Sequence, residues 1–275
     1  MLPLGAAGPG PKALALRPDR PQAALPLLGR PGTGRVVWAR EGAAWLRLPD
    51  GIIGLAPPGA PLGPRWVRRA EPWPDLAEGD PVLVDDGLRT ADGTRFLDGR
   101  QAVGWLGPLP NYTALTPAPA RTVISGSLAQ CRASVLLEQP WSATVEPAVD
   151  SIGRLPPLEA LHIVARALGG LGPGLTPAGD DALSGILFAF RAMGGPSVEP
   201  GLLTVVRSVH TSDLGGTVLQ AAAAGFHIEP VHDLVMAAVA GDRGAAKDAV
   251  AELDRYGSSS GADLAYGLRL AFTRH

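Results

Sequence analysis

Residues 169–185 read Gly-Gly-Leu-Gly-Pro-Gly-Leu-Thr-Pro-Ala-Gly-Asp-Asp-Ala-Leu-Ser-Gly, and this stretch decides how the second half of the chain folds. Five of its first eleven residues are glycine, which lets the main chain approach a ligand or another segment closely. We expect Thr176 to cap a helix and Pro177 to occupy its first position. Apolar residues at helical spacing support that helix: Leu183, Ile186, Leu187 and Phe190. A glycine-rich loop that leads into a helix is a ready anion site, because the first amide N–H groups of a helix lack partners within it.

Two adjacent carboxylates, Asp180 and Asp181, follow the loop and are the candidate catalytic residues. Neighbouring residues of a helix point about 100° apart, so we expect only one of the two to face a common site. That carboxylate would either bind N–H donors of a substrate or hold a divalent metal such as Mg²⁺ that bridges to an anion. Plain capping is the competing explanation, since a carboxylate in the first helical turn contributes about 0.3–1 kcal/mol of stability.

A second junction of the same kind lies near the C-terminus, where residues 256–263 read Tyr-Gly-Ser-Ser-Ser-Gly-Ala-Asp. Ser260 is placed as an N-cap, and Asp263 stands three residues later, as in a capping box. We predict that the two helix starts face one pocket and bind a small anion there. The residues expected to line this anion site are Gly172, Gly174, Thr176, Gly179, Ser260, Gly261 and Asp263.

The pattern along the chain predicts an α+β protein with two domains. Residues 1–112 are expected to form a strand-rich domain, a small barrel or sandwich, in which residues 1–33 show no steady period. Residues 113–275 are expected to form an all-α bundle that carries the glycine-rich loop, with helices over residues 121–137 and 157–168 among others. Five tryptophans of the strand-rich half are interpreted as core fillers: Trp38, Trp45, Trp66, Trp73 and Trp105.

The charge and composition of the chain exclude several classes of protein. The 275 residues carry a formal net charge of −2, and no long basic block is present, which argues against nucleic acid as a partner. No run of about 18 apolar residues occurs, so no membrane span is expected. The single cysteine cannot form an internal disulfide, and no signal peptide is recognisable, so we expect a cytoplasmic protein.

The glycine-rich stretch also carries a family resemblance. Leu171–Gly185 closely resembles Gly-Leu-Thr-Pro-Ser-Gly-Asp-Asp followed by an apolar helix, a signature of the AllH-type subunit family of oxamate carbamoyltransferase, formerly a domain of unknown function. Gly257–Asp263 is similar to the late motif of that family, Gly-His-Ser-Ser-Gly-x-Asp, and Thr211–Gly225 is similar to its Thr/Ser-rich helix start. The resemblance covers the chain from about Gly34 to the C-terminus.

Three positions depart from the family pattern. Ala178 and Gly215 stand where serine is usual, and Ser258 stands where histidine is common, so no role for those side chains is carried over. These differences leave open a paralogue with another substrate.

The resemblance implies a subunit that acts with companion subunits in purine (allantoin) nitrogen catabolism. The reaction exchanges oxalurate and phosphate for oxamate and carbamoyl phosphate, which makes the chain part of a transferase with small anionic substrates. Two alternatives stay open. The chain could be a non-catalytic scaffold or ligand sensor, or a Mg²⁺-dependent helical hydrolase or phosphotransferase that uses Asp180, Asp181 and Asp263 as ligands.

Overall fold

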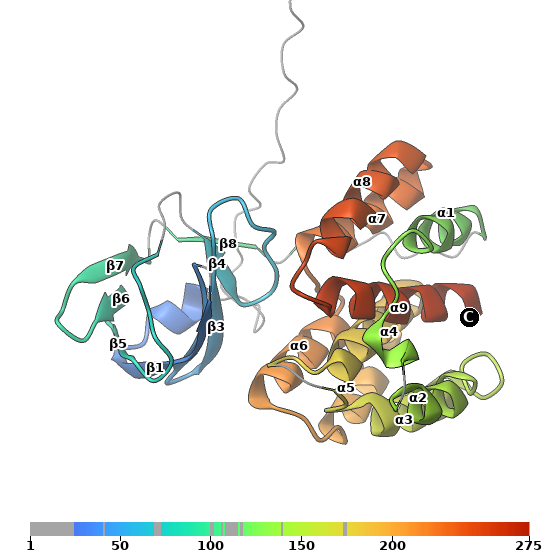
Figure 1. Cartoon of the computed structure of the whole chain (residues 1–275), viewed down its shortest axis with the longest axis horizontal. Helices are drawn as coiled ribbons and strands as arrows, with labels where there is room; N and C mark the ends of the chain where they lie inside the picture. The colour runs from blue at the N-terminus through green and yellow to red at the C-terminus, as the bar shows by residue number, and fades with distance from the viewer. Residues whose placement is uncertain are drawn as a thin grey trace, which may run out of the picture.

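The computed structural model describes residues 25–40, 42–68, 73–99, 102–105, 107, 115, 118–138, 140–172 and 175–274. These residues form a strand-rich half and a helical half that lie side by side (Figure 1). The predicted α+β class, with strands first and helices after, is confirmed. The predicted domain boundary between residues 112 and 113 lies outside the described residues and stays a prediction.

The strand-rich half is one curled, eight-stranded sheet with the order β7-β6-β5-β1-β2-β3-β4-β8. Neighbouring strands are antiparallel except for β3 and β4, which run parallel. The strands are β1 (Gly32–Arg40), β2 (Ala43–Leu48), β3 (Gly51–Ala56), β4 (Trp66–Arg68), β5 (Pro81–Val84), β6 (Gly87–Thr90), β7 (Arg95–Asp98) and β8 (Val103–Gly104), after the 3₁₀ helix η1 (Leu25–Leu28).

The helical half places the glycine-rich helix at its centre, where α4 is buried along most of its length. The helices are α1 (Ala118–Leu128), α2 (Ser142–Val149), α3 (Pro157–Leu168), α4 (Ala178–Gly194), α5 (Glu199–Arg207), α6 (Asp213–Ala223), α7 (Glu229–Ala240), α8 (Arg243–Asp254) and α9 (Ser260–Arg274), with the 3₁₀ helices η3 (Val135–Leu137) and η4 (Pro196–Val198). Among the helices of the described residues, none combines the length and the apolar character that a membrane span requires.

The helix predicted over residues 121–137 is wrong in its second half, because α1 ends at Leu128. The apolar spacing continues through this segment, but Ser134 adopts an extended conformation and its hydroxyl accepts a hydrogen bond from the amide of Leu136. Ser134 thereby starts the separate turn η3. A serine that bonds its neighbouring backbone competes with helix formation, and here it outweighs the apolar pattern.

The two halves are joined where the start of α7 meets the loop between β3 and β4. The amide of Glu229 donates to the carbonyl of Leu62, and the amide of Leu62 donates to the Glu229 carboxylate, each over 2.7 Å. Trp45 and Ile52 of the sheet also pack with Leu214 of α6. These contacts hold one face of the sheet against the helices.

Candidate functional site

The start of α4 depends on close backbone packing at Gly179. The Gly179 amide donates to the carbonyl of Leu171 over 2.8 Å, and a Cβ at this position would overlap the carbonyl oxygen of Leu168. Only glycine fits there without a shift of the backbone. The helix begins at Ala178, with Pro177 rather than Thr176 at the N-cap, so the expected cap is displaced by one residue.

The start of α9 is built in the same way. The Gly261 amide donates to the carbonyl of Tyr256 over 2.9 Å, and a Cβ on Gly261 would overlap the carbonyl oxygen of Leu253. Ser260 is the first residue of the helix. The amides of Gly179 and Gly261 therefore already have partners within the chain. Both glycines have a packing role, and their amides are not available to an anion.

Asp180 turns away from the pocket and connects α4 to the segments around it. Its side chain is buried, with 1% exposure, and accepts hydrogen bonds from the Gly170 amide over 2.9 Å and from the Thr211 hydroxyl. A Cβ at Gly215 would overlap the Asp180 carboxylate, so the chain has no room for the serine that the related motif carries there. The Asp180 carboxylate thus holds α4 against the segments that carry Gly170 and Thr211, which is a structural role.

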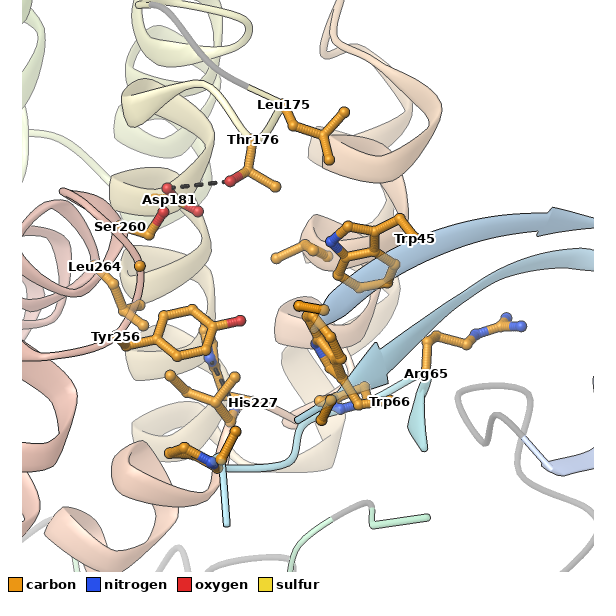
Figure 2. Close-up of a pocket in the computed structure, with 18 of the residues that line it drawn as sticks. Trp45, Arg65, Trp66, Leu175, Thr176, Asp181, His227, Tyr256, Ser260 and Leu264 are labelled. Atoms are coloured by element: carbon orange, nitrogen blue, oxygen red, sulfur yellow. Dashed lines mark hydrogen bonds between the residues drawn. The ribbon is translucent and has the colours of Figure 1, made fainter. Parts of the chain in front are cut away.

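Asp181 points the other way, toward the sheet, as the helical geometry of adjacent residues requires (Figure 2). Its exposed fraction is 8%, and its Oδ2 accepts a hydrogen bond from the Thr176 hydroxyl, whose Oγ1 lies 3.4 Å away. The Ser260 hydroxyl approaches from α9 and also bonds the carboxylate. The two helix starts thus meet at Asp181, with Thr176 and Ser260 on either side of it.

Asp263 of α9 is held by η3 and not by Thr176 or Ser260. It is fully buried, and its Oδ1 accepts a hydrogen bond from the Ser134 hydroxyl over 2.6 Å and one from the Val135 amide over 3.2 Å. These bonds fasten α9 to η3. Asp263 does not line the pocket, although its charge is close enough to act on Asp181.

A pocket of about 510 Å³ opens between the sheet and the helices at Asp181. Strands β1, β2 and β4 and the loop between β3 and β4 form one wall, and the starts of α4 and α9, α6 and the segment before α7 form the other (Figure 2). The polar side chains that line its helical side include Thr176, Asp181, Thr217, Tyr256 and Ser260, and its aromatic residues include Trp38, Trp45, Trp66 and Phe226.

The position of Asp181 raises its pKa well above the usual value. Burial is the largest cause, and the nearby charges of Asp263 and Asp180 add to it, while the hydroxyls of Ser260 and Thr176 act in the opposite direction. Burial likewise raises the pKa of the Tyr256 phenol, and the charge of Asp181 adds to that rise. Asp181 and Tyr256 are therefore close neighbours at the polar end of the pocket.

His227 lines the pocket and is held as a neutral ring. Its Nδ1 accepts the Ile228 amide over 3.0 Å, so the proton of the neutral ring is on Nε2, which lies 3.0 Å from the Ser184 hydroxyl. Ser184 in turn donates to the carbonyl of Asp181 over 2.7 Å. Burial, with a smaller effect of His232, lowers the pKa of His227 to about 3. Both ring nitrogens are engaged, so His227 fixes the local structure rather than exchanging protons.

Two of the pocket tryptophans were expected to fill the core of the sheet, and the structure corrects this. Trp45 alternates along β2 with buried Leu46, so it lies on the opposite face, against the helices. Trp66 follows Arg65, whose backbone is left-handed with φ of 67°, and its ring covers Gly54. A bulky apolar residue on the outer face of a strand was the signal that this face is covered.

Of the two remaining glycines of the predicted anion site, Gly172 lies in the described part of the chain. Gly172 has φ of 100°, a conformation that favours glycine, and packs against Ala178 rather than lining the pocket. Gly174 lies outside the described residues. Within the described part of the chain, no group of three His, Cys, Asp or Glu side chains is arranged to hold a metal ion. The three aspartates of the two motifs bond different groups, Asp180 with Gly170 and Thr211, Asp181 with Thr176, and Asp263 with Ser134, which does not fit a shared Mg²⁺ site.

Residues 168–272 match the family model described as oxamate carbamoyltransferase subunit AllH. Neither the curated proteins nor the solved structures include a significant match to the chain.

The matched stretch contains both glycine-rich junctions and the helical wall of the pocket. It carries Thr176, Asp181, Tyr256 and Ser260, whereas the tryptophans of the other wall lie outside it. The match and the two motifs agree on the same region of the sequence. Residues 168–272 are therefore similar to the family of the oxamate carbamoyltransferase subunit AllH.

Proposed function

We propose that the chain is a subunit of an oxamate carbamoyltransferase-like complex and that the pocket at Asp181 binds its small substrate. The family match supports the first part of the proposal. The observation that carries the second part is the convergence of Thr176, Asp181 and Ser260, from two separate motifs, on one pocket.

The proposed reaction moves a carbamoyl group between oxalurate and phosphate. The bond between the carbamoyl carbon and the oxamate nitrogen breaks, a bond from that carbon to a phosphate oxygen forms, and the nitrogen takes a proton. The products are oxamate and carbamoyl phosphate, which fits a place in purine (allantoin) nitrogen catabolism. Companion subunits are expected to take part.

In this proposal Asp181 orients the substrate by accepting hydrogen bonds from the N–H groups of the substrate amide. The hydroxyls of Thr176 and Ser260 donate to substrate oxygens, because the amides of Gly179 and Gly261 are already bonded. The anionic end of the substrate faces the arginines that line the pocket, Arg40 and Arg255. Positioning and charge stabilisation then account for the contribution of this chain.

The test is reconstitution of the complex with and without this chain. Formation of carbamoyl phosphate from oxalurate and phosphate is measured, and assembly is followed by size-exclusion chromatography. We expect turnover only with the chain present, and a large loss of turnover in Thr176→Val combined with Ser260→Ala. If this double variant assembles and turns over normally, the chain is a scaffold and the pocket is not the substrate site.

A further inference from the structure

Tyr256 is held at the pocket by the turn between α8 and α9. Its amide donates to the carbonyl of Leu253 over 3.0 Å, and its carbonyl accepts the Gly261 amide over 2.9 Å. Gly257, the next residue, has φ of 63°, a left-handed conformation that favours glycine. The ring of Tyr256 packs on the helical core, and its hydroxyl is directed toward the sheet (Figure 2). The turn and the core thus fix the phenol oxygen at the pocket.

Trp66 of the sheet approaches this hydroxyl from the other wall of the pocket. Its indole N–H donates to the phenol oxygen of Tyr256, since an indole nitrogen can only donate. The Trp66 ring is itself confined. A Cβ on Gly54 would overlap it, and the centroid of the Trp45 ring lies 4.3 Å away, with the two planes tilted by 58°. A residue of the sheet therefore holds one lone pair of a phenol that belongs to the helical half.

The phenol keeps its proton and can donate it in a hydrogen bond. Burial and the charge of Asp181 raise the pKa of Tyr256, and the opposing effect of the Trp66 donor is smaller. Asp181 acts on the phenol through its charge, while its own hydrogen bonds come from the hydroxyls of Thr176 and Ser260. A neutral O–H donor and a carboxylate acceptor thus stand side by side at the polar end of the pocket.

This pair of groups is complementary to one edge of a carbamoyl group, where an N–H donor and a carbonyl acceptor lie next to each other. We propose that Tyr256 binds the substrate by donating its phenol O–H to the carbonyl oxygen of the carbamoyl group whose N–H donates to Asp181, and that Trp66 is the positioning residue that orients the phenol. This proposal rests on the proposed function in taking the pocket at Asp181 as the substrate site. It adds a substrate-binding residue, and it gives a role to a sheet residue outside the family match.

The carbonyl oxygen is where charge develops in the proposed transfer. A phosphate oxygen adds to the carbamoyl carbon, and the electron pair of the C=O bond moves onto the carbonyl oxygen. That pair returns as the bond from the carbamoyl carbon to the oxamate nitrogen breaks, and the nitrogen takes the proton that the phosphate loses. A fixed donor at the carbonyl oxygen stabilises the intermediate charge, and Tyr256 keeps its own proton throughout.

The experiment is calorimetric titration of the full chain alone with phosphonoacetamide, a stable anion in which CH₂ replaces the bridging oxygen of carbamoyl phosphate. Tyr256→Phe removes only the hydroxyl, and we expect it to weaken binding about fivefold or more, because one hydrogen bond is lost. Tyr266→Phe is the matched control, since Tyr266 of α9 packs on the helical core outside the pocket, and its affinity is expected to stay unchanged. Thermal unfolding establishes that each variant is folded. No binding by the wild-type chain, or an unchanged affinity in Tyr256→Phe, would overturn the proposal.

A double-mutant cycle tests the positioning role of Trp66. Trp66→Phe keeps an aromatic ring and removes the N–H group. We expect it to weaken phosphonoacetamide binding about threefold in the wild-type chain and to have no effect in the Tyr256→Phe chain, because the two residues act through one hydrogen bond. A purely structural contribution of Trp66 would weaken binding equally in both chains, and that result contradicts positioning through the phenol.

The two proposals fail separately. Phosphonoacetamide binding with the expected variant pattern, in a chain whose complex does not transfer carbamoyl groups, retains the roles of Tyr256 and Trp66 and removes the transferase. Carbamoyl transfer by a complex in which Tyr256→Phe binds and turns over like the wild type does the reverse. If both proposals hold, Tyr256→Phe lowers the rate at saturating substrate about a hundredfold.

Discussion

Gly267 of α9 lies directly on the backbone carbonyl of Ala182 of α4, so close that a Cβ on the glycine would overlap the oxygen. A similar close contact runs in the other direction, because a Cβ on Gly185 of α4 would lie 2.6 Å from the carbonyl oxygen of Leu264 of α9. The two helices therefore approach each other through glycines on both sides. This close approach brings their N-termini to the same pocket.

The same spacing relates the motifs that precede these glycines. Gly179 and Asp181 stand six and four residues before Gly185, and Gly261 and Asp263 stand six and four residues before Gly267. Asp181 and Asp263 thus occupy equivalent positions of two helices with reciprocal contacts. Only Asp181 opens into the pocket, because Ser134 and η3 cover Asp263.

The first prediction concerns this helix contact. Gly267→Ala is expected to lower the free energy of unfolding by about 2 kcal/mol or more, because overpacking against backbone outweighs the better helix propensity of alanine. Gly126→Ala is the control, since Gly126 lies in α1 and a Cβ there meets nothing within 4 Å. It is expected to raise stability by about 0.5–1 kcal/mol. Urea unfolding measures both, and equal effects would contradict the close contact.

A second prediction concerns Asp180 as a structural carboxylate. Thr211→Val removes the hydroxyl that bonds this buried side chain, and we expect a loss of about 1.5–3 kcal/mol of stability. Thr204→Val serves as the control, because Thr204 is exposed on α5 and bonds only its own helix, to the carbonyl of Pro200. Its effect is expected to stay within about 0.5 kcal/mol. If Thr211→Val leaves the free energy of unfolding unchanged, the Asp180 carboxylate does not need this hydrogen bond.

The raised pKa of Asp181 sets the sign of a pH effect. The folded chain holds a proton on Asp181 at pH values where the unfolded chain has lost it, so this group costs stability as the pH rises above the ordinary aspartate pKa of about 3.9. Asp181→Asn removes this cost. We expect the variant to gain stability relative to the wild type as the pH rises through this window, measured by urea unfolding at a series of pH values. A constant difference at all pH values contradicts the shift.

His227 is expected to stay neutral in the folded protein. Its pKa is lowered to about 3, so the ring should show no protonation by NMR from about pH 8 down to about pH 5. The unfolded chain takes up that proton, so His227 also contributes stability that is lost as the pH falls below about 6.5. A His227 titration midpoint near that value would mean that the ring is not held by Ser184 and Ile228.

Local sequence patterns predict most helices and strands of this chain. They do not predict features that depend on contacts between distant residues. The helix over residues 157–168 and the strands of the sheet follow from periodicity and turn residues, which act within a few positions. The break of the helix after Leu128 depends on Ser134, whose hydroxyl is also held by Asp263, far along the chain. A long-range partner of this kind leaves no periodic signal.

The sequence likewise predicts one part of the candidate site and not the other. The sequence predicts that Thr176 and Ser260 meet and that one of two adjacent aspartates faces them, since helix geometry fixes that relation. It does not predict the tryptophan wall, because the covering of the outer sheet face depends on how the two halves pack. It also assigns the amides of Gly179 and Gly261 to an anion, although nearby carbonyls already accept them.

The most direct measurement of the central claim is the carbamoyl-transfer rate of the reconstituted complex containing Asp181→Asn. The matched control is Asp248→Asn, which changes an exposed carboxylate of α8 away from the pocket. If Asp181 orients the substrate, the rate at saturating substrate falls at least about a hundredfold while the variant stays folded and assembled, and the control keeps its rate. A folded, assembled Asp181→Asn complex that turns over as fast as the control contradicts the account.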